Sequence, residues 1–470
     1  MIQLDRPGSG PESTPWRDPA RWWPQLDAAT AQLDPPFATI SVEALAWNAH
    51  TMLDRAAGSP IRVASKSVRV RAVLDAVLAL PGYRGILAYT LAEALWLAET
   101  HDDVVVGYPS VDRASIARLA ADEKLAQRVT IMVDDVAQLD LVDAVAAPSG
   151  RAPIRVCLEL DASYQSRLLG FVGVRRSPVR EPTAARALAE AVVARPGFKL
   201  VGMMAYEAQI AGVTNRGIGR GTIIRSMQRA SARELAERRG AAVAAVREVA
   251  ELEFVNGGGT GSIESTHADA SVTEIAAGSG LFGPHLFDGY VHFSPAPAAA
   301  FALGVVRRPT PEVATLLGGG WIASGPAGAD RLPQPTWPQG LRMLPREAAG
   351  EVQTPVTGPA ARDLHLGDRV WMRHTKAGEL SEHVNEFAVV QGGSVVDTVP
   401  SYRGEGKAFL LARRCGAPAR IRPPTLPDCC DPAAPGATGG APSAPRRYSG
   451  PTPRAWTRWS PSCAPPASAG

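Results

Sequence analysis

The residue in this chain that most strongly suggests chemistry is Lys66. It is one of only five lysines in 470 residues, and it lies in IRVASKS (61–67), at the end of a short apolar run typical of a buried β-strand. In a barrel of parallel strands, the carboxyl ends of the strands form the catalytic face. An amine placed there can attack a carbonyl carbon and form an imine. Taken alone, Lys66 could also be structural, as we expect of Lys124 on the solvated helical segment ADEKLAQR.

Two glycine clusters support a reactive role for Lys66. Residues 256–262 read NGGGTGS and residues 278–280 read GSG, and each cluster follows an apolar run. Bare amides and hydroxyls in such loops can surround a phosphate group, and barrels often hold phosphate after their last two strands. Either cluster alone could be a tight turn. NGGGTGS is not the dinucleotide pattern, which needs Gly at Ser262, nor a P-loop, which needs a following Lys. A reactive amine with a phosphate site predicts pyridoxal 5'-phosphate as cofactor.

The elements that would position these residues alternate between strands and helices. Apolar runs rich in Val, Ile, Leu and Met each precede a segment with helical periodicity. The runs lie at 61–67, 85–90, 103–110, 128–135, 154–161, 199–207, 252–262 and 273–283. Strands that are apolar on both faces are typical of a parallel sheet covered by helices. Eight of them over about 220 residues predict an α/β fold, a (β/α)8 barrel of the TIM type. An open doubly wound sheet is the alternative.

Composition divides the chain into four regions. The barrel is expected over 36–299. Residues 300–411 contain short apolar runs separated by Gly and Pro, which predicts a mostly-β domain. Residues 1–35, with three tryptophans, are expected to be an extension that packs on one of these two domains. Residues 412–470 are rich in Pro and Arg without apolar periodicity, so we expect a disordered tail.

The charge distribution argues against nucleic-acid binding by the folded part. The formal net charge is +3, but residues 415–470 contain six Arg and two Asp, which sum to +4 and leave −1 for the rest. No run of about 18 apolar residues occurs, so no membrane-spanning helix is expected. The first residues lack a basic stretch followed by an apolar one, so no secretory signal is expected and the expected compartment is the cytoplasm.

Several segments together resemble the fold-type III pyridoxal-phosphate enzymes, which include alanine racemase, D-threonine aldolase and D-serine dehydratase. These segments are VASKSVR, ILAYTLAEALWLAE, VVVGYP, GMMAYEAQIAG, FVNGGGTGSI, AAGSGLFGP, RHTKAGELSEHVNE and TVPSYRGEGKAFL, and they lie between residues 37 and 411. The resemblance is strongest to the bacterial group called amino acid deaminase/aldolase. It implies an alanine racemase-like N-terminal barrel followed by a β domain.

The resemblance also implies roles for individual residues. Lys66 would form the imine with the cofactor and move the proton at the α-carbon of the substrate. Tyr206 would line the cofactor pocket, although it could also be a core aromatic residue. Arg167 would contact the cofactor ring, with Arg175 as the competing candidate. The remaining cofactor-binding residues would be Asn256, Gly258, Gly259, Thr260, Gly278 and Ser279.

His374 is the second catalytic residue that the resemblance implies. In the D-threonine aldolase and D-serine dehydratase branch, a divalent metal is bound by a His and, two residues later, by Cys or Asp. Here Lys376 stands at the second position, and a charged lysine is not an ordinary metal ligand. Glu379 and Glu382 are alternative ligands, so the sequence leaves open whether a divalent metal is bound. His374 could instead be the base for the β-hydroxyl of the substrate or a polar strand residue, and Lys376 could pair with the substrate carboxylate.

These implications give a pyridoxal-phosphate-dependent lyase, an aldolase or a deaminase, for small β-hydroxy amino acids of D configuration. Cleavage of the Cα–Cβ bond would release glycine and an aldehyde, whereas loss of the hydroxyl would lead to deamination. One alternative is a racemase of the alanine racemase type, which needs a second base. Tyr402 is the only tyrosine in 300–411 and does not match the racemase motif. A non-catalytic pyridoxal-phosphate-binding protein is the other alternative. We expect a homodimer that binds an amino acid substrate, without nucleic-acid or membrane partners.

Overall fold

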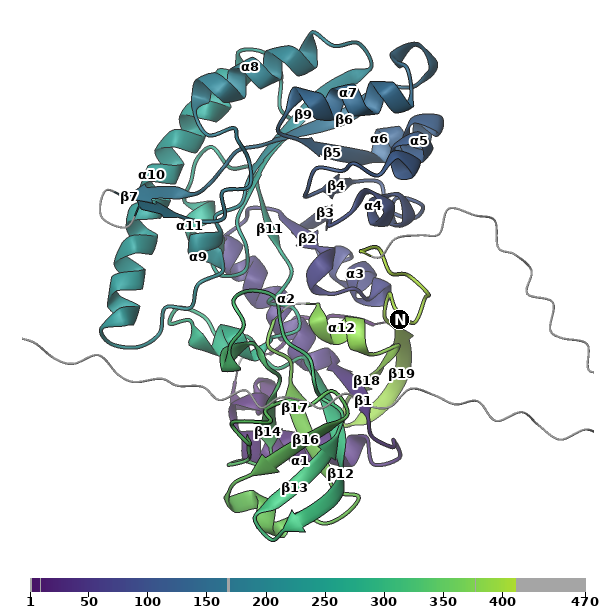
Figure 1. Ribbon diagram of the computed structural model, residues 1–470, viewed down its shortest axis with the longest axis vertical. Helices are drawn as coiled ribbons and strands as arrows, with labels where there is room; N and C mark the ends of the chain where they lie inside the picture. Colours follow the sequence, from purple (N-terminus) through teal and green to yellow (C-terminus); the bar gives the residue numbers. More distant parts are fainter. Residues whose placement is uncertain (1, 9, 167–169, 377, 411–470) are drawn as a thin grey trace, which may run out of the picture. The chain divides into compact units, whose positions relative to one another are not determined.

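The computed structural model describes residues 2–8, 10–166, 170–376 and 378–410, whose elements are drawn in Figure 1. The predicted disordered tail and Arg167 lie outside these residues. Within the described ranges, no helix is both long enough and apolar enough to cross a membrane.

Eight parallel strands close into a barrel in the order β10-β11-β2-β3-β4-β5-β6-β9 (Figure 1). The strands are β2 (Ile61–Ala64), β3 (Tyr83–Ala88), β4 (Val104–Val106), β5 (Val129–Val133), β6 (Ile154–Glu159), β9 (Phe198–Ala205), β10 (Phe254–Gly257) and β11 (Glu274–Ala277). Each of the eight apolar runs forms one strand, which confirms the predicted (β/α)8 barrel. The doubly wound alternative is wrong, because β11 pairs with β2 and leaves no open edge.

Helices surround the barrel and cover the outer face of its strands, which explains why those strands are apolar on both faces. All five residues of β5, for example, are buried. The helices are α2 (Val42–Ala56), α3 (Arg71–Leu78), α4 (Leu91–Leu97), α5 (Arg113–Ala121), α6 (Glu123–Arg128), α7 (Val136–Val145), α8 (Pro182–Val193), α9 (Ala208–Ala211), α10 (Arg220–Arg247) and α11 (Ile263–His267). Polar N-caps start several of them directly after a strand. Asp135, for example, forms a capping box with Gln138 at the start of α7.

The second domain is built on a nine-stranded mixed sheet, which confirms the predicted mostly-β domain. Its strands are β1 (Phe37–Ser41), β12 (Ala299–Thr310), β13 (Val313–Leu317), β14 (Gln334–Trp337), β15 (Arg342–Met343), β16 (Gln353–Thr357), β17 (Arg369–Arg373), β18 (Glu386–Gln391) and β19 (Ser394–Pro400). A short helix, α12 (Glu379–His383), connects β17 to β18. The expected boundary at residue 36 assigns β1 to the barrel, whereas β1 pairs with β12 and β18 in this sheet.

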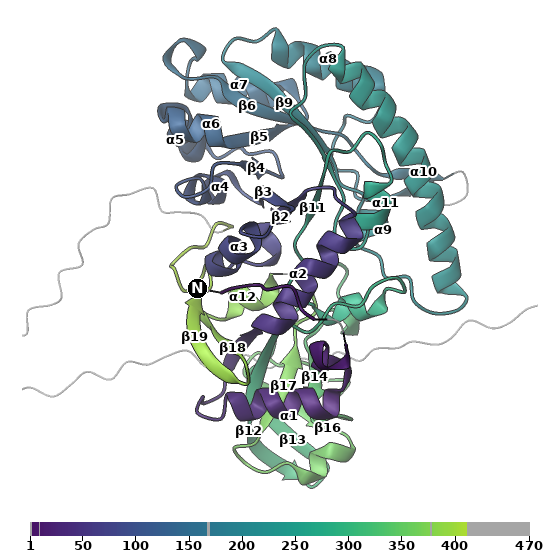
Figure 2. The ribbon, with the colours of Figure 1, turned by 180° about the vertical axis from the view of Figure 1, so that it is seen from behind.

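The N-terminal region packs on the β domain through α1 (Pro19–Ala29), which Figure 2 shows lying across that domain. The Trp371 indole, in β17, donates from Nε1 to Asp27 Oδ1 at 2.9 Å. Arg369, two residues earlier in β17, donates to the carbonyl oxygens of Asp27 and Thr30. The rings of Trp23 and Trp371 lie 6.0 Å apart. Both aromatic stacking and polar contacts therefore hold α1 in place.

Candidate active site

Lys66 lies at the carboxyl end of β2. The strand ends at Ala64, and a 3₁₀ turn, Ser65–Ser67, carries the lysine. The neighbouring strand fixes this turn, because Ser65 Oγ donates to the carbonyl oxygen of Leu87 in β3 at 3.1 Å. The Lys66 side chain is exposed, and its Nζ donates to Tyr108 Oη at 3.0 Å. The amine is therefore on the catalytic face of the barrel and open to a small molecule.

Tyr108, which follows β4, is the immediate partner of Lys66. Burial alone would raise the pKa of the Tyr108 hydroxyl, but the positive charges of Lys66 and Arg176 outweigh burial and lower it. A hydroxyl with a lowered pKa, hydrogen-bonded to an amine, can exchange a proton with that amine. Sequence reasoning missed Tyr108. The signal that could have found it is its place two residues beyond the end of the apolar strand in VVVGYP.

The two glycine clusters converge next to Lys66. Gly278 follows β11 and lies so close to the end of β2 that a β-carbon there would be 2.5 Å from the carbonyl oxygen of Ala64. The neighbouring Ser279 Oγ donates to Thr260 Oγ1, in the other cluster, at 3.0 Å. No described residue accepts a hydrogen bond from the backbone N–H of Thr260 or Ser279. Two hydroxyls and two free amides thus gather beside the end of β2, next to Gly278, which contacts Ala64 two positions before Lys66. This donor set suits a phosphate group.

The backbone amides of Gly258 and Gly259, two of the predicted cofactor-binding residues, are already bonded within the protein. The Gly258 N–H donates to the carboxylate of Glu207 at 3.0 Å, and the Gly259 N–H donates to Ser262 Oγ at 3.1 Å. Glu207 is buried and also accepts from the hydroxyls of Ser262 and Thr266. The Glu207 carboxylate therefore holds the loop in shape, and the amide of Thr260 at the tip of the loop is the part that is free to bind an anion.

Asn256 is not part of the phosphate loop, and its predicted cofactor contact is not seen. Its side chain lies inside the barrel, where Nδ2 donates to Glu274 Oε1 at 2.8 Å. Glu274 begins β11 and pairs with the buried guanidinium of Arg62, which also pairs with Asp103. Because Glu274 stands at the amino end of its strand, Asn256 belongs to a polar network below the site and supports the barrel interior.

Arg176 stands where the sequence placed Arg167 or Arg175. Its guanidinium carbon lies 5.5 Å from the ring centroid of Tyr108 and 5.7 Å from that of Tyr206. Arg175 instead stacks on Phe171 at 4.4 Å and turns away with a positive φ of 47°. Arg167 lies outside the described residues. Of the two described arginines in this segment, Arg175 and Arg176, it is Arg176 that lies near Tyr108, the partner of Lys66.

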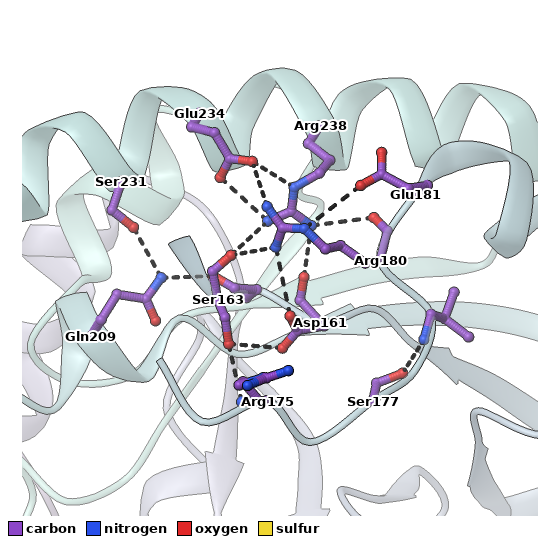
Figure 3. A network of polar contacts seen from close by, with 12 residues as sticks. Asp161, Ser163, Arg175, Ser177, Arg180, Glu181, Gln209, Ser231, Glu234 and Arg238 are labelled. Atoms are coloured by element: carbon purple, nitrogen blue, oxygen red, sulfur yellow. Dashed lines mark hydrogen bonds and ion pairs between the residues drawn. The ribbon is translucent and has the colours of Figure 1, made fainter. Parts of the chain in front are cut away.

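A buried polar network fixes the segment that carries Arg176 (Figure 3). Arg238, in α10, donates to the carbonyl oxygens of Asp161 and Ser163 at 2.7 and 3.1 Å. Arg180 also donates to the Ser163 carbonyl, while Ser163 Oγ accepts from the Arg175 backbone N–H at 3.0 Å. Figure 3 shows these side chains gathered between α10 and the loop after β6. The network thus holds the start of this segment, at Asp161 and Ser163, and its end, at Arg180. Between them lies the hairpin of β7 (Tyr164–Ser166) and β8 (Gly170–Val172).

Tyr206 lies beside the first of the two glycine loops, and its place in a cofactor pocket stays a prediction. It follows β9, and its ring lies against Gly259, where a β-carbon would be 3.2 Å from Tyr206 Cε2. Burial, together with the nearby Tyr108, raises the pKa of its hydroxyl to about 12. Tyr206 therefore stays neutral and can donate a hydrogen bond, and Gly259 leaves space for its ring.

His374, the second predicted catalytic residue, follows β17 and is buried. Its side chain is fully buried, and neither ring nitrogen has a hydrogen-bond partner among the described residues. Burial, with the nearby positive charge of Arg373, lowers its pKa to about 3, so the ring is neutral. Its nearest aromatic neighbour is the core residue Phe282, at 6.5 Å between ring centroids. The ring is thus closed off in this structure, and its role as a base for the substrate stays a prediction.

The loop between β17 and α12 brings a second lysine to the site. Gly378, with φ of 77°, lies against the turn of Lys66, where a β-carbon would collide with the Lys66 carbonyl oxygen. Two residues earlier, Lys376 is half-buried. Burial and the positive charges of Arg331 and Lys66 lower its pKa. The β domain therefore contributes side chains to the barrel's catalytic face.

The side chains near Lys376 do not fit a divalent metal. A metal site needs several deprotonated N, O or S ligands around one point. In the described part of the chain, no three His, Cys, Asp or Glu side chains come close enough to share an ion. Glu379 accepts from the backbone N–H groups of Thr375 and Lys376, and Glu382 pairs with Arg69. Glu382 and one oxygen of Glu379 are thus engaged, and the nearby Lys376 is a cation.

The same region does fit pyridoxal phosphate. The exposed amine of Lys66 can hold the aldehyde, and the free amides and hydroxyls of Thr260 and Ser279 suit the phosphate. Gly278 gives the close backbone approach that joins these two parts. The rings of Tyr108 and Tyr206, with Arg176 between them, provide aromatic walls and a permanent charge. The amine therefore matches the aldehyde of the cofactor, and the amides and hydroxyls match its phosphate.

Comparisons with known proteins agree with this geometry. The chain is 28% identical over 238 residues to D-threonine aldolase of Arthrobacter sp., covering 49% of this chain and 57% of that protein. It is also 28% identical over 258 residues to 3-hydroxy-D-aspartate aldolase of Paracoccus denitrificans, covering 54% of this chain and 61% of the relative. The chain thus spans less than two thirds of either relative.

A solved structure shows the same fold. The crystal structure of D-threonine aldolase from Filomicrobium marinum aligns with a TM-score of 0.68 at 21% identity, over 80% of this chain and 96% of that one. At sequence level, residues 40–285 match the family described as alanine racemase, N-terminal domain. That range includes every strand of the barrel, Lys66 and both glycine loops. Because the match covers more than half of the 470 residues, the chain belongs to the alanine racemase N-terminal domain family.

Proposed function

We propose that this protein is a pyridoxal-phosphate-dependent lyase that acts on small β-hydroxy amino acids of D configuration. The observation that carries the proposal is the position of Lys66, exposed on the catalytic face and joined through Gly278 to the donors of Thr260 and Ser279. The relatives named D-threonine aldolase and 3-hydroxy-D-aspartate aldolase support the substrate class.

Each residue at the site has a separate role in the proposed reaction. Bound pyridoxal phosphate supplies an electron sink for the electron pair that bond cleavage leaves at the α-carbon. Lys66 holds the cofactor and then moves a proton at that carbon. Thr260 and Ser279 hold the phosphate, and Arg176 supplies a permanent positive charge beside the two tyrosines. The β domain closes the site through the loop that carries Lys376 and Gly378.

Tyr108 is our candidate for the base that the β-hydroxyl requires, in place of His374. It is the described hydroxyl in direct contact with Lys66, and nearby cations lower its pKa. Deprotonation of a β-hydroxyl starts a retro-aldol cleavage, whereas in a dehydration the α-proton is removed and protonation of the β-hydroxyl lets it leave as water. A hydroxyl that can both donate and accept a proton, as Tyr108 can, serves either reaction. The identity of the products therefore distinguishes an aldolase from a deaminase.

Racemisation finds less support. It requires a second base on the face opposite Lys66, and the tyrosine available in the β domain is Tyr402. That side chain is only 2% exposed and packs edge-on against Trp96 at 4.9 Å. A non-catalytic carrier is also disfavoured, because a carrier has no need of side chains from a second domain at the site.

The test is to purify the full chain with pyridoxal phosphate and incubate it with D-threonine, D-serine and 3-hydroxy-D-aspartate. Glycine with an aldehyde identifies an aldolase, and ammonia with an oxo acid identifies a deaminase. Borohydride treatment followed by peptide mapping should place the cofactor on Lys66. Lys66→Ala should lose turnover and the visible absorbance of the cofactor, whereas Lys124→Ala, on the exposed face of α6, should keep both. Bound cofactor without turnover of any amino acid would contradict the lyase.

We also propose a homodimer, by analogy with the family. Light scattering on the purified chain measures this directly, and a monomer that turns over substrate would contradict it.

A further inference from the structure

Four cationic side chains surround the same small region. Lys66 comes from the end of β2, Arg176 from the segment after β6, and Arg331 and Lys376 from the β domain. Arg331, Lys66 and Arg176 all act electrostatically on the Lys376 ammonium. Such a group of like charges is unfavourable unless an anion neutralises it.

The described part of the protein supplies few such anions. Lys66, Arg176 and Lys376 have no ion pair with any described carboxylate, and Arg331 has only Asp330, at 3.6 Å. Glu379 acts electrostatically on Lys376, and Glu159 on Arg176, but burial raises the pKa of both carboxyl groups to about 7. The four cations therefore face carboxyl groups that are only partly ionised at neutral pH, and the cluster keeps a net positive charge.

Arg331 and Lys376 also have unused hydrogen-bonding capacity. The Nε and Nη1 atoms of Arg331 are buried yet make no hydrogen bond within the described residues. Lys376 Nζ makes one long hydrogen bond, 3.4 Å to the carbonyl oxygen of Ser324. The backbone brings the two residues together, because the Arg331 carbonyl accepts from Ala323 N–H at 2.8 Å, next to Ser324. Buried donors without partners are costly, so a ligand that accepts from them is expected.

The other two cations are already committed under the proposed function. Lys66 holds the cofactor, and Arg176 lies between the rings of Tyr108 and Tyr206. Two positive charges, on Lys376 and Arg331, are then left for the substrate. A monocarboxylic amino acid supplies one carboxylate, whereas a dicarboxylic one supplies two and neutralises both.

We propose that Lys376 and Arg331 bind the carboxylates of the substrate, that the preferred substrate is a dicarboxylic β-hydroxy amino acid, and that these two side chains do this without a divalent metal. This inference rests on the proposed function for the reaction. The anion site itself can be measured without turnover. Binding of a substrate carboxylate also gives a physical reason for a cation at position 376, because a metal ligand at that position would have to be neutral or negative.

The experiment is calorimetric titration of the cofactor-loaded full chain with succinate, which has the four-carbon dicarboxylate skeleton and no reactive amine. Acetate serves as the single-carboxylate comparison. Lys376→Met and Arg331→Met should each weaken succinate binding about tenfold or more, as loss of a charge-assisted pair does. Lys376→Arg should restore part of the affinity. Lys124→Met, on the exposed face of α6, should bind succinate like the wild type.

Two further measurements separate this inference from the proposed function. The visible absorbance of the cofactor should be the same in Lys376→Met as in the wild type, which shows that the variant is folded and loaded. The ratio of kcat/KM for 3-hydroxy-D-aspartate to that for D-threonine should fall about tenfold in Lys376→Met. If succinate binding depends on Lys376 but no amino acid is turned over, the anion site stands and the lyase assignment fails.

Three results would overturn the inference. One is succinate affinity that is unchanged in both methionine variants. Another is an unchanged kcat/KM ratio in Lys376→Met. The third is turnover that a chelator removes and a divalent cation restores, because the site would then depend on a metal.

Discussion

Gly378 of the β domain packs directly against the carbonyl oxygen of Lys66, so the two domains meet at the reactive lysine. Gly378 has a φ of 77°, and a β-carbon at this position would collide with that oxygen. This contact limits how far Lys376 can stand from Lys66, because Lys376 lies only two positions before Gly378. It is the structural reason why the β domain takes part in the site.

Gly378→Ala should therefore reduce both stability and activity. The substitution combines a left-handed backbone with a steric collision, and we expect a loss of about 1–3 kcal/mol in the free energy of unfolding. Turnover should fall by about tenfold or more as the loop moves away from Lys66. Gly393→Ala is the matched control, because Gly393 has a φ of 78° but faces open space. Equal losses of activity in the two variants would show that strain alone, without the contact to Lys66, explains the effect.

Glu93 is a buried carboxyl group behind the turn of Lys66. It is fully buried, and its Oε2 accepts from the Tyr89 N–H at 2.7 Å. Burial raises the pKa of Glu93 from 4.5 to about 7, against hydrogen bonds that lower it. The folded protein thus holds a proton that the unfolded chain releases between pH 4.5 and 7. Stability should decline as the pH rises through this window and be constant with respect to this group above it.

Glu93→Gln should remove that part of the pH dependence. Compared with the wild type, the variant should gain stability between pH 4.5 and pH 8, by at most about 3 kcal/mol from a shift of this size. Denaturant unfolding at several pH values measures the difference. Glu253→Gln is a useful contrast, because hydrogen bonding to Arg155 lowers the pKa of Glu253 to about 2. Its stabilising effect should be present at neutral pH and fade as the pH falls from 4.5 towards 2. A wild-type minus Glu93→Gln difference that does not change with pH would refute this account of Glu93.

Arg238 should be important for cofactor binding although it does not reach Lys66. Its guanidinium holds the carbonyl oxygens of Asp161 and Ser163, which begin the segment that carries Arg176 (Figure 3). Arg238→Met would leave buried acceptors unpaired and cost about 2–4 kcal/mol of stability. It should also weaken pyridoxal phosphate binding, because Arg176 would lose its fixed position beside Tyr108.

The control for Arg238 is an arginine whose ion pairs are exposed. Arg186, on α8, pairs with Glu190 and Glu248 at the surface. Arg186→Met should change stability by less than about 1 kcal/mol and leave cofactor affinity unchanged. Unfolding curves and cofactor titrations of both variants make the comparison. Normal cofactor affinity in a folded Arg238→Met protein would show that the network does not position Arg176.

The barrel could be predicted from sequence because each of its strands is a local apolar run next to a helical pattern. β1 could not be assigned in the same way. Its register is set by β12 and β18, which lie far away along the chain, with Thr39 opposite Ala300 and Ala388. Local patterns carry no information about such a pairing. Sequence reasoning therefore located the eight barrel strands and did not predict the strand at 37–41, which depends on these distant partners.

Within the site, sequence reasoning named Lys66, Tyr206 and the loops of Thr260 and Ser279, because their chemistry is visible in residue type and position, and their roles stay predictions. Sequence reasoning could not predict the direction of side chains that depends on the local backbone. Arg175 turns away because its φ is positive, and this leaves Arg176 to face the tyrosines. His374 ends a strand as expected, yet it points into the core. Neighbouring residues of the same type, such as two arginines, cannot be told apart without these dihedral angles.

Ser279→Ala should separate the phosphate site from the reactive amine. Ser279 Oγ bonds to Thr260 Oγ1, and the two hydroxyls with their free amides are our phosphate donors. The variant should bind pyridoxal phosphate about tenfold more weakly, since a hydrogen bond to a charged group is lost. Pyridoxal, which lacks the phosphate, should bind as well as it does to the wild type. Ser265→Ala is the control, because that hydroxyl donates to the Ser262 carbonyl inside its own helix turn. Equal weakening for both ligands would mean that Ser279 acts on Lys66 rather than on the phosphate, because only a phosphate contact distinguishes the two.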